Sequence, residues 1–128
     1  MSRKNTNVPT EFQEACTFVD WLELMKNQGK VLDFCHIANE SYGGTRADML
    51  RGAKLKRQGR KRGVFDYEVF LPKTKTHPAR ELRIELKRSG GKASQEQLHW
   101  LQVYAECQIE AAICQGAEAA IALVKEFI

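Results

Sequence analysis

Apolar and polar residues alternate along two short stretches near the middle of the chain, residues 64–71 and 81–87. A period of two is typical of strands with one buried face. The stretch between them, residues 72–79, holds two prolines and two lysines and is expected to turn. A hairpin symmetric about this loop has one wholly apolar face, and a slip of one residue would turn one strand's apolar side away. The predicted pairs on that face are Phe65 with Leu86, Tyr67 with Ile84, and Val69 with Leu82.

The same register places two acidic residues, Asp66 and Glu85, directly opposite each other. Carboxylates paired in this way, with Cβ atoms about 4.5–5.5 Å apart, destabilise a sheet. A divalent cation such as Mg²⁺ would remove the conflict, since it prefers oxygen ligands. Lys87 follows on the same face, about 6.7 Å further along the strand. Two metal ligands and an ammonium suit metal-assisted phosphodiester hydrolysis. A solvated polar face is the alternative, and the hairpin alone leaves both open.

The rest of the pattern predicts helices over residues 11–27, 45–58 and 117–127 and strands over 31–37 and 109–114. A further helix is expected to open at Ser94, with Gln97 completing a capping box. Phe12 and Leu98 belong to the apolar stripes of their helices. Residues 1–10 are expected to be a flexible N-terminus and residues 11–128 a single domain. The predicted order is α-β-α-β-β-α-β-α, with a parallel crossover between the last two strands.

Composition places the chain among ordinary globular proteins and excludes several other classes. Hydrophobic residues make up 43% of the 128 residues and charged residues 28%. The sequence has neither an apolar run of about 20 residues nor an N-terminal secretory signal, so we expect a cytoplasmic protein with no membrane partner. The four cysteines form no C-x-x-C pair and are expected to be buried, reduced thiols rather than a zinc site.

Basic charge is concentrated around the predicted hairpin. Residues 46–92 contain 15 Lys and Arg against 5 Asp and Glu, whereas the rest of the chain has 5 against 11. The net charge of +4 therefore hides a strongly basic middle and an acidic remainder. A basic region beside paired carboxylates is what a phosphate-binding surface needs, although a run of charge is usually a solvated face.

Four short motifs occur in order along the chain: HIANE at 36–40, GVFD at 63–66, IELK at 84–87 and GKASQEQLHWL at 91–101. This series resembles the VRR-NUC domain, the virus-type replication-repair nuclease of the PD-(D/E)XK superfamily. The family shows H-I-P-N-E, G-x-P-D, E-L-K and S-P-E-Q-x-x-W-L in this order, and residues 111–128 are similar to its ending. The resemblance covers roughly residues 11–128. It implies an α/β fold with a restriction-endonuclease-like αβββαβ core, in which helices flank a mixed central sheet.

The resemblance also implies a metal centre in the hairpin. Asp66 and Glu85, with the Leu86 carbonyl, would bind Mg²⁺ or Mn²⁺, and Lys87 would be catalytic. Three family prolines are replaced in this chain, which changes local turns but removes no ligand. The replacing residues are Ala38, Phe65 and Gln95.

Three further side chains join the expected catalytic site through the resemblance. The family uses a metal-binding glutamate on the first helix, for which Glu14 is the better match and Glu11 the fallback. Pattern alone favours a solvated helix residue at Glu14. Glu40 closes the H-x-x-N-E stretch, and Gln97 matches the glutamine after the E-x-K strand. The capping box by itself would also account for Gln97.

The expected function is metal-dependent, structure-specific cleavage of DNA. Stand-alone members of this size, often phage-encoded, resemble Holliday-junction resolvases that work as homodimers, so a four-way junction is the leading substrate. The alternatives are a flap or 5′-end nuclease or nickase, and a non-catalytic DNA-binding module. The residues expected to hold DNA are Arg46, Arg51, Lys54, Lys56, Arg57, Arg60, Lys61, Arg62, Arg88 and Lys92.

Overall fold

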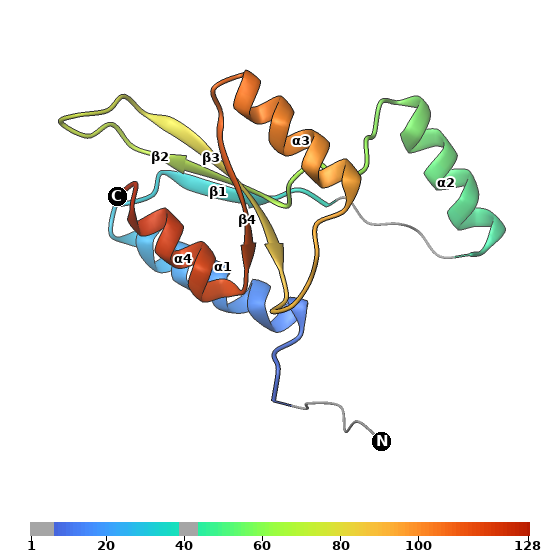
Figure 1. The fold of residues 1–128 in the computed structure, drawn as a ribbon, viewed down its shortest axis with the longest axis horizontal. Coiled ribbons are helices and arrows are strands. Elements are labelled where there is room, and N and C mark those ends of the chain that lie inside the picture. The colour runs from blue at the N-terminus through green and yellow to red at the C-terminus, as the bar shows by residue number, and fades with distance from the viewer. Residues whose placement is uncertain (1–6, 39–43) are drawn as a thin grey trace.

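A computed structural model describes residues 7–38 and 44–128. Its elements follow the predicted order α-β-α-β-β-α-β-α (Figure 1). The helices are α1 (Glu11–Asn27), α2 (Arg46–Arg57), α3 (Gln95–Glu106) and α4 (Ala117–Lys125). The strands are β1 (Asp33–His36), β2 (Tyr67–Leu71), β3 (Arg80–Lys87) and β4 (Glu110–Gln115).

The four strands form one mixed sheet in the order β1-β2-β3-β4. β2 is antiparallel to β1 and β3, and β4 is parallel to β3. The predicted hairpin register is confirmed, because Tyr67 pairs with Ile84 and Val69 with Leu82. Helices α1 and α4 lie together on one side of the sheet and α3 on the other (Figure 1). This is the predicted α/β architecture of a mixed sheet flanked by helices.

The main core lies between the sheet and the pair α1 and α4. The apolar face of the hairpin packs there against Phe18 and Leu22 of α1 and Val124 of α4, which are fully buried. Burial of side chains of this size stabilises a fold by about 1.5–3 kcal/mol each. Their spacing on α1 is the helical repeat from which that element was predicted.

The apolar ladder of the hairpin is shorter than predicted. The β2–β3 pairing begins at Tyr67, so Phe65 does not pair with Leu86. Phe65 is fully buried, but it packs edge-on against Tyr104 of α3, with ring centroids 5.0 Å apart. The chain leaves the ladder before Tyr67, and Phe65 thereby joins the layer on the other side of the sheet.

Two helix residues expected in apolar stripes are exposed instead: Phe12 is 76% exposed and Leu98 52%. Both lie in the first turn of their helix, and other residues of that turn make its contacts, Glu14 with the start of α4 and Gln97 with Glu85. The prediction of buried cysteines was also wrong for three of the four, since only Cys114 is buried. None of the helices formed by the described residues is both long and apolar enough to cross a membrane.

Helix α2 stands apart from the rest of the molecule (Figure 1). It begins with Thr45 as N-cap, whose side chain accepts a hydrogen bond from the Asp48 amide. None of its twelve residues is buried, and Met49 and Leu50 are 67% and 55% exposed. The helix therefore owes its stability to capping and local interactions rather than to packing.

Candidate active site

The two opposed carboxylates lie where β3 continues beyond the start of β2. Residues 85–87 of β3 pair only with β4, because the antiparallel ladder stops at the Tyr67–Ile84 pair. Glu85 Oε2 accepts a hydrogen bond from the Asp66 amide (3.0 Å), and Asp66 Oδ2 accepts one from the Leu86 amide (3.3 Å). Each side chain thus bonds the backbone of the opposite segment, which holds the two carboxylates against each other.

Helix α3 fixes the orientation of the Glu85 carboxylate. Ser94 and Gln97 form the predicted capping box, in which Gln97 Oε1 accepts from the Ser94 amide (2.9 Å). The same Gln97 side chain donates from Nε2 to Glu85 Oε1 (2.6 Å). One glutamine therefore caps α3 and also contacts Glu85, the predicted metal ligand.

Lys87 is the next side chain on this patch of β3. Its ammonium Nζ lies 3.7 Å from Glu85 Oε1. Pairing with Gln115 of β4 fixes the backbone here, and the Lys87 carbonyl accepts a hydrogen bond from the Gly116 amide (2.7 Å). The lysine is therefore held beside the carboxylates by the central strand, a more rigid support than a loop.

Burial makes the charged form of this pair costly. The Glu85 side chain is almost completely buried, and burial followed by repulsion from Asp66 raises its pKa to about 8, although Lys87 lowers it. Burial is also the main reason why the pKa of Asp66 is raised, and the nearby Glu11 adds to this effect. A hydrogen bond from the Leu86 amide and the charge of His36 act in the opposite direction. Carboxylates with raised pKa values in a cavity are typical of functional sites.

Asp66, Glu85, Leu86, Lys87 and Gln97 line a single cavity of about 760 Å³. Helix α1 forms its other wall, through residues that include Glu11 and Phe12. The five residues come from the segment before β2, from β3 and from α3, and the fold brings them together. The predicted convergence of Asp66, Glu85 and Lys87 is thus present in the structure.

The two candidate carboxylates of the first helix lie in different places. Glu11 faces the cavity that holds Asp66 and Glu85. Glu14 does not line it; its Oε2 accepts a short hydrogen bond from the Ala117 amide at the start of α4. Of the two, Glu11, the fallback in the sequence analysis, is therefore the first-helix carboxylate that shares the cavity with Asp66 and Glu85. Glu40 lies outside the described residues.

The donor set fits a hard divalent cation. Mg²⁺ is commonly bound by one or two carboxylates together with waters and substrate phosphates. Asp66 and Glu85 supply two carboxylates side by side, and a cation there would offset the repulsion that raises their pKa values. Over the described ranges 7–38 and 44–128, no three His, Cys, Asp or Glu side chains form a group able to hold a metal. The residues present thus suit Mg²⁺ or Mn²⁺ better than an ion held only by protein ligands.

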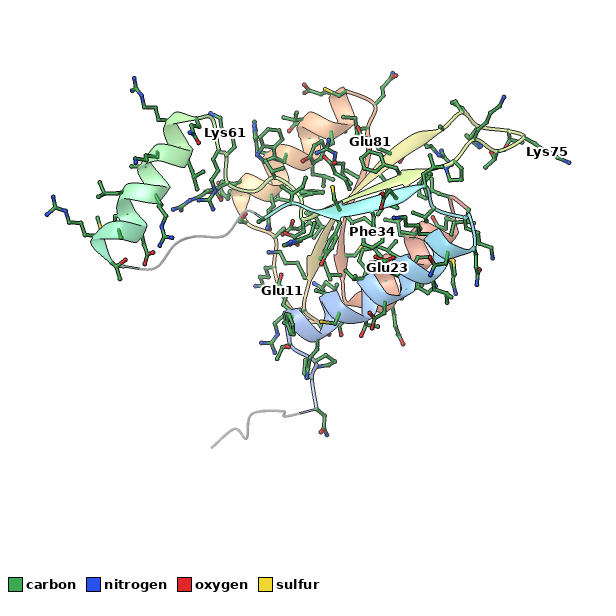
Figure 2. All side chains as sticks on the ribbon, turned by 180° about the vertical axis from the view of Figure 1, so that it is seen from behind. Glu11, Glu23, Phe34, Lys61, Lys75 and Glu81 are labelled. Carbon is green, nitrogen blue, oxygen red and sulfur yellow. The ribbon has the colours of Figure 1, made fainter. Side chains whose placement is uncertain are left out.

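The predicted DNA-binding residues fall into three groups. Arg46, Arg51, Lys54, Lys56 and Arg57 lie on α2, away from the sheet (Figures 1 and 2). Arg60, Lys61 and Arg62 lie on the segment that leads from α2 into β2, and Arg88 and Lys92 lie on the loop between β3 and α3. The basic side chains thus extend from the cavity outward to α2.

His36 and Glu11 line the cavity, although neither was the residue first chosen for the site. His36 lines it and stacks near Tyr67, with ring centroids 5.1 Å apart. It begins the first of the four motifs, HIANE, and so the sequence does mark it. Glu11 was ranked below Glu14, and the position of α1 relative to the sheet and to α4 separates these two residues.

A solved structure described as "VRR_NUC domain protein" matches this chain with a TM-score of 0.66 and 21% sequence identity. The match covers 94% of this chain and 88% of the other. No family model matches the sequence, and neither does any curated protein. At this identity the likeness concerns the fold. The resemblance predicted from the motifs is confirmed at that level: the chain is folded like a VRR_NUC domain protein.

Proposed function

We propose that this protein is a divalent-metal-dependent deoxyribonuclease that hydrolyses phosphodiester bonds in the cavity between α1 and β3. The observation that carries the proposal is the convergence of Asp66, Glu85 and Lys87 on one side of that cavity. The VRR_NUC fold supports it, since that domain type is a nuclease domain, and so does the basic charge around the hairpin.

Each residue of the cavity has a distinct role in this proposal. Asp66 and Glu85 would hold Mg²⁺ or Mn²⁺, with the Leu86 carbonyl as a further oxygen. The cation supplies a Lewis acid for the charge that develops on the phosphate. Gln97 keeps Glu85 oriented through the hydrogen bond to Oε1. Lys87, close to Glu85 but not hydrogen-bonded to it, orients the attacking water and stabilises negative charge on the phosphate oxygens.

Glu11 completes the acidic side of the cavity in our proposal. Its support is its place on the cavity wall and its effect on the pKa of Asp66. Glu14 instead serves α4 as a capping group. Glu40, which the motif resemblance also assigns to the site, stays a prediction.

A four-way DNA junction is the substrate we propose, cut by a homodimer. Two symmetric strands must be cut to resolve a junction, whereas the described chain provides one cavity of this composition. The motif resemblance to junction resolvases supports the same substrate. The basic side chains of α2, the following segment and the β3–α3 loop would hold the phosphate backbone.

The test compares cleavage of a labelled four-way junction, a flap and a plain duplex in Mg²⁺ or Mn²⁺, with and without chelator. We expect paired, symmetric nicks in the junction, and a loss of about 100-fold or more in rate for Asp66→Asn and Lys87→Ala. Lys75→Ala, at the tip of the β2–β3 loop, is the matched control. Cleavage of the flap alone would retain the site and replace the substrate. Binding without metal-dependent cleavage of any substrate would refute the nuclease proposal and leave a DNA-binding module.

A further inference from the structure

A second hollow, of about 590 Å³, lies beside the candidate active site. Its walls are the segment that leads into β2 and the first turns of α3. The lining side chains combine two cations, an acid, an amide and two aromatic rings: Lys61, Arg62, Glu96, Gln95, His99 and Trp100. Of these, the function proposed above uses only Lys61 and Arg62, as part of the basic surface that holds the phosphate backbone, and it gives no role to the aromatic wall.

The Trp100 ring, which forms the aromatic wall of this hollow, is held by contacts with Arg62, Tyr104 and His99. Trp100 Nε1 donates a hydrogen bond to the Arg62 carbonyl (3.0 Å), which ties the ring to the opposite wall. The Trp100 ring lies 5.8 Å from Tyr104 and 5.9 Å from His99, measured between ring centroids. Tyr104 is buried and packs on Phe65. The ring is thus held in place before any ligand arrives.

Gly63 brings the two walls close together. It adopts a φ of +86°, and a Cβ at this position would lie 2.5 Å from the Glu96 carbonyl carbon and 2.7 Å from the Gln97 amide nitrogen. Only glycine allows this approach. The cationic segment 61–62 is therefore kept against the start of α3, where backbone amides and the helix dipole also favour an anion.

The hollow connects to the candidate metal centre. A smaller cavity of about 260 Å³ lies between them. It shares Arg62 and Glu96 with the hollow, and Asp66, Glu85 and Gln97 with the active-site cavity. A chain of linked phosphates that enters the active site can thus continue into the hollow.

We propose that the hollow binds an unpaired nucleotide next to the phosphate that is cut. Its phosphate lies against Lys61 and Arg62, and its base stacks on the Trp100–His99 wall. Glu96 accepts a hydrogen bond from an N–H group on the edge of the base, such as the N3–H of thymine. Aromatic platforms beside cations are the usual way in which proteins hold single-stranded nucleic acid. This inference rests on the proposed nuclease function, and it adds a preference for substrates with unpaired bases at the cleavage site.

The first test measures the base directly. The chain has two tryptophans, so Trp21→Phe leaves Trp100 as the one fluorophore of its kind. In a Trp21→Phe/Lys87→Ala protein with Mg²⁺, we expect a short oligothymidylate to quench Trp100 fluorescence. An oligomer of the same length with abasic sugars should bind through its phosphates and leave the fluorescence unchanged. Equal quenching by both oligomers, or quenching by neither, would overturn the proposal.

The second test uses variants in the otherwise native chain. We expect His99→Ala to weaken binding of the oligothymidylate by about tenfold and binding of the abasic oligomer hardly at all. Lys61→Ala should weaken both. The matched controls, His77→Ala and Lys75→Ala, lie on the β2–β3 loop at the opposite end of the molecule (Figure 2) and should change neither. An unchanged affinity in His99→Ala would overturn the assignment of the base.

The two proposals fail in distinguishable ways. Base-dependent quenching without cleavage of any substrate would support the nucleotide site and refute the nuclease. Metal-dependent cleavage that His99→Ala leaves unchanged on a substrate with unpaired bases, together with the absence of quenching, would support the nuclease and refute the nucleotide site.

Discussion

The charge of Glu85 should make the stability of the metal-free protein depend on pH. Burial and the neighbouring Asp66 raise the pKa of Glu85 from 4.5 to about 8, against an opposing effect of Lys87. Between these values the folded protein keeps a proton that the unfolded chain has released. The free energy of unfolding therefore falls as the pH rises through this window. Below pH 4.5 the protonated Glu85 contributes its full stabilisation of the folded protein, and above about pH 8 this stabilisation is lost.

The size of the effect follows from the two pKa values. At about 1.36 kcal/mol for each pH unit, the change amounts to at most about 5 kcal/mol. That is a large part of the 5–15 kcal/mol that typically stabilises a domain. Glu85→Gln removes the charge and keeps an acceptor for the Asp66 amide. It leaves the Gln97 Nε2 group without its acceptor, which costs about 1 kcal/mol.

We therefore expect Glu85→Gln to be about 1 kcal/mol less stable than the parent near pH 4 and about 3–4 kcal/mol more stable near pH 9. The assay is urea unfolding followed by far-UV circular dichroism, with chelator and a reductant, at several pH values. Glu23→Gln, an exposed change on α1 (Figure 2), is the matched control and should follow the parent at every pH. A difference between Glu85→Gln and the parent that stays constant with pH would refute the assignment of a buried, repelled carboxylate.

Three other changes test the remaining contacts. Gln97→Ala should lower the free energy of unfolding by about 1 kcal/mol, because the cap of α3 is lost. It should also lower kcat more than it weakens DNA binding, as steady-state kinetics and a binding titration can show. A kcat equal to that of the parent would contradict the role of Gln97 in orienting Glu85. Glu11→Gln should lower metal-dependent cleavage at an unchanged Tm. Glu14→Ala should instead lower the free energy of unfolding by about 2 kcal/mol, as measured in urea. If Glu14→Ala abolished cleavage and Glu11→Gln did not, Glu14 would be the carboxylate of the proposed metal site. Gly63→Ala should destabilise the protein by about 2 kcal/mol or more, because its φ is positive and its Cβ would meet α3; a Tm equal to that of the parent would show that the segment can move away.

The hairpin register could be predicted because it depends on pairs of neighbours. A slip of one residue would put Tyr67 and Val69 on the face opposite to Leu82 and Ile84, and symmetry about the loop selects the alignment that the structure has. The point at which pairing stops is set by other elements. Tyr104 of α3 draws Phe65 into its own layer, and no residue within the hairpin signals this.

In the candidate active site, too, some features follow from neighbouring residues and others from the packing of distant elements. Local motifs were sufficient to bring Asp66, Glu85, Lys87 and Gln97 together, since three belong to the hairpin and the fourth caps the next helix. The choice between Glu11 and Glu14 depends on where α4 begins relative to α1, which is a tertiary relation. The exposure of Cys16, Cys35 and Cys107 has a similar origin, because a residue in an apolar segment is buried only if another element covers it.

Helix α2 contributes no buried side chain, and this has a consequence for how the protein can evolve. Substitutions in a packed helix are judged first by their effect on folding, so its sequence can change only slowly. Substitutions along α2 have little effect on folding as long as the helix still forms, because surface changes rarely alter the free energy of unfolding by more than about 0.5 kcal/mol. Selection can therefore adapt this helix to a new surface independently of the sheet that holds the carboxylates. The chain thus combines a sheet whose sequence is restrained by packing with a helix whose sequence packing restrains little.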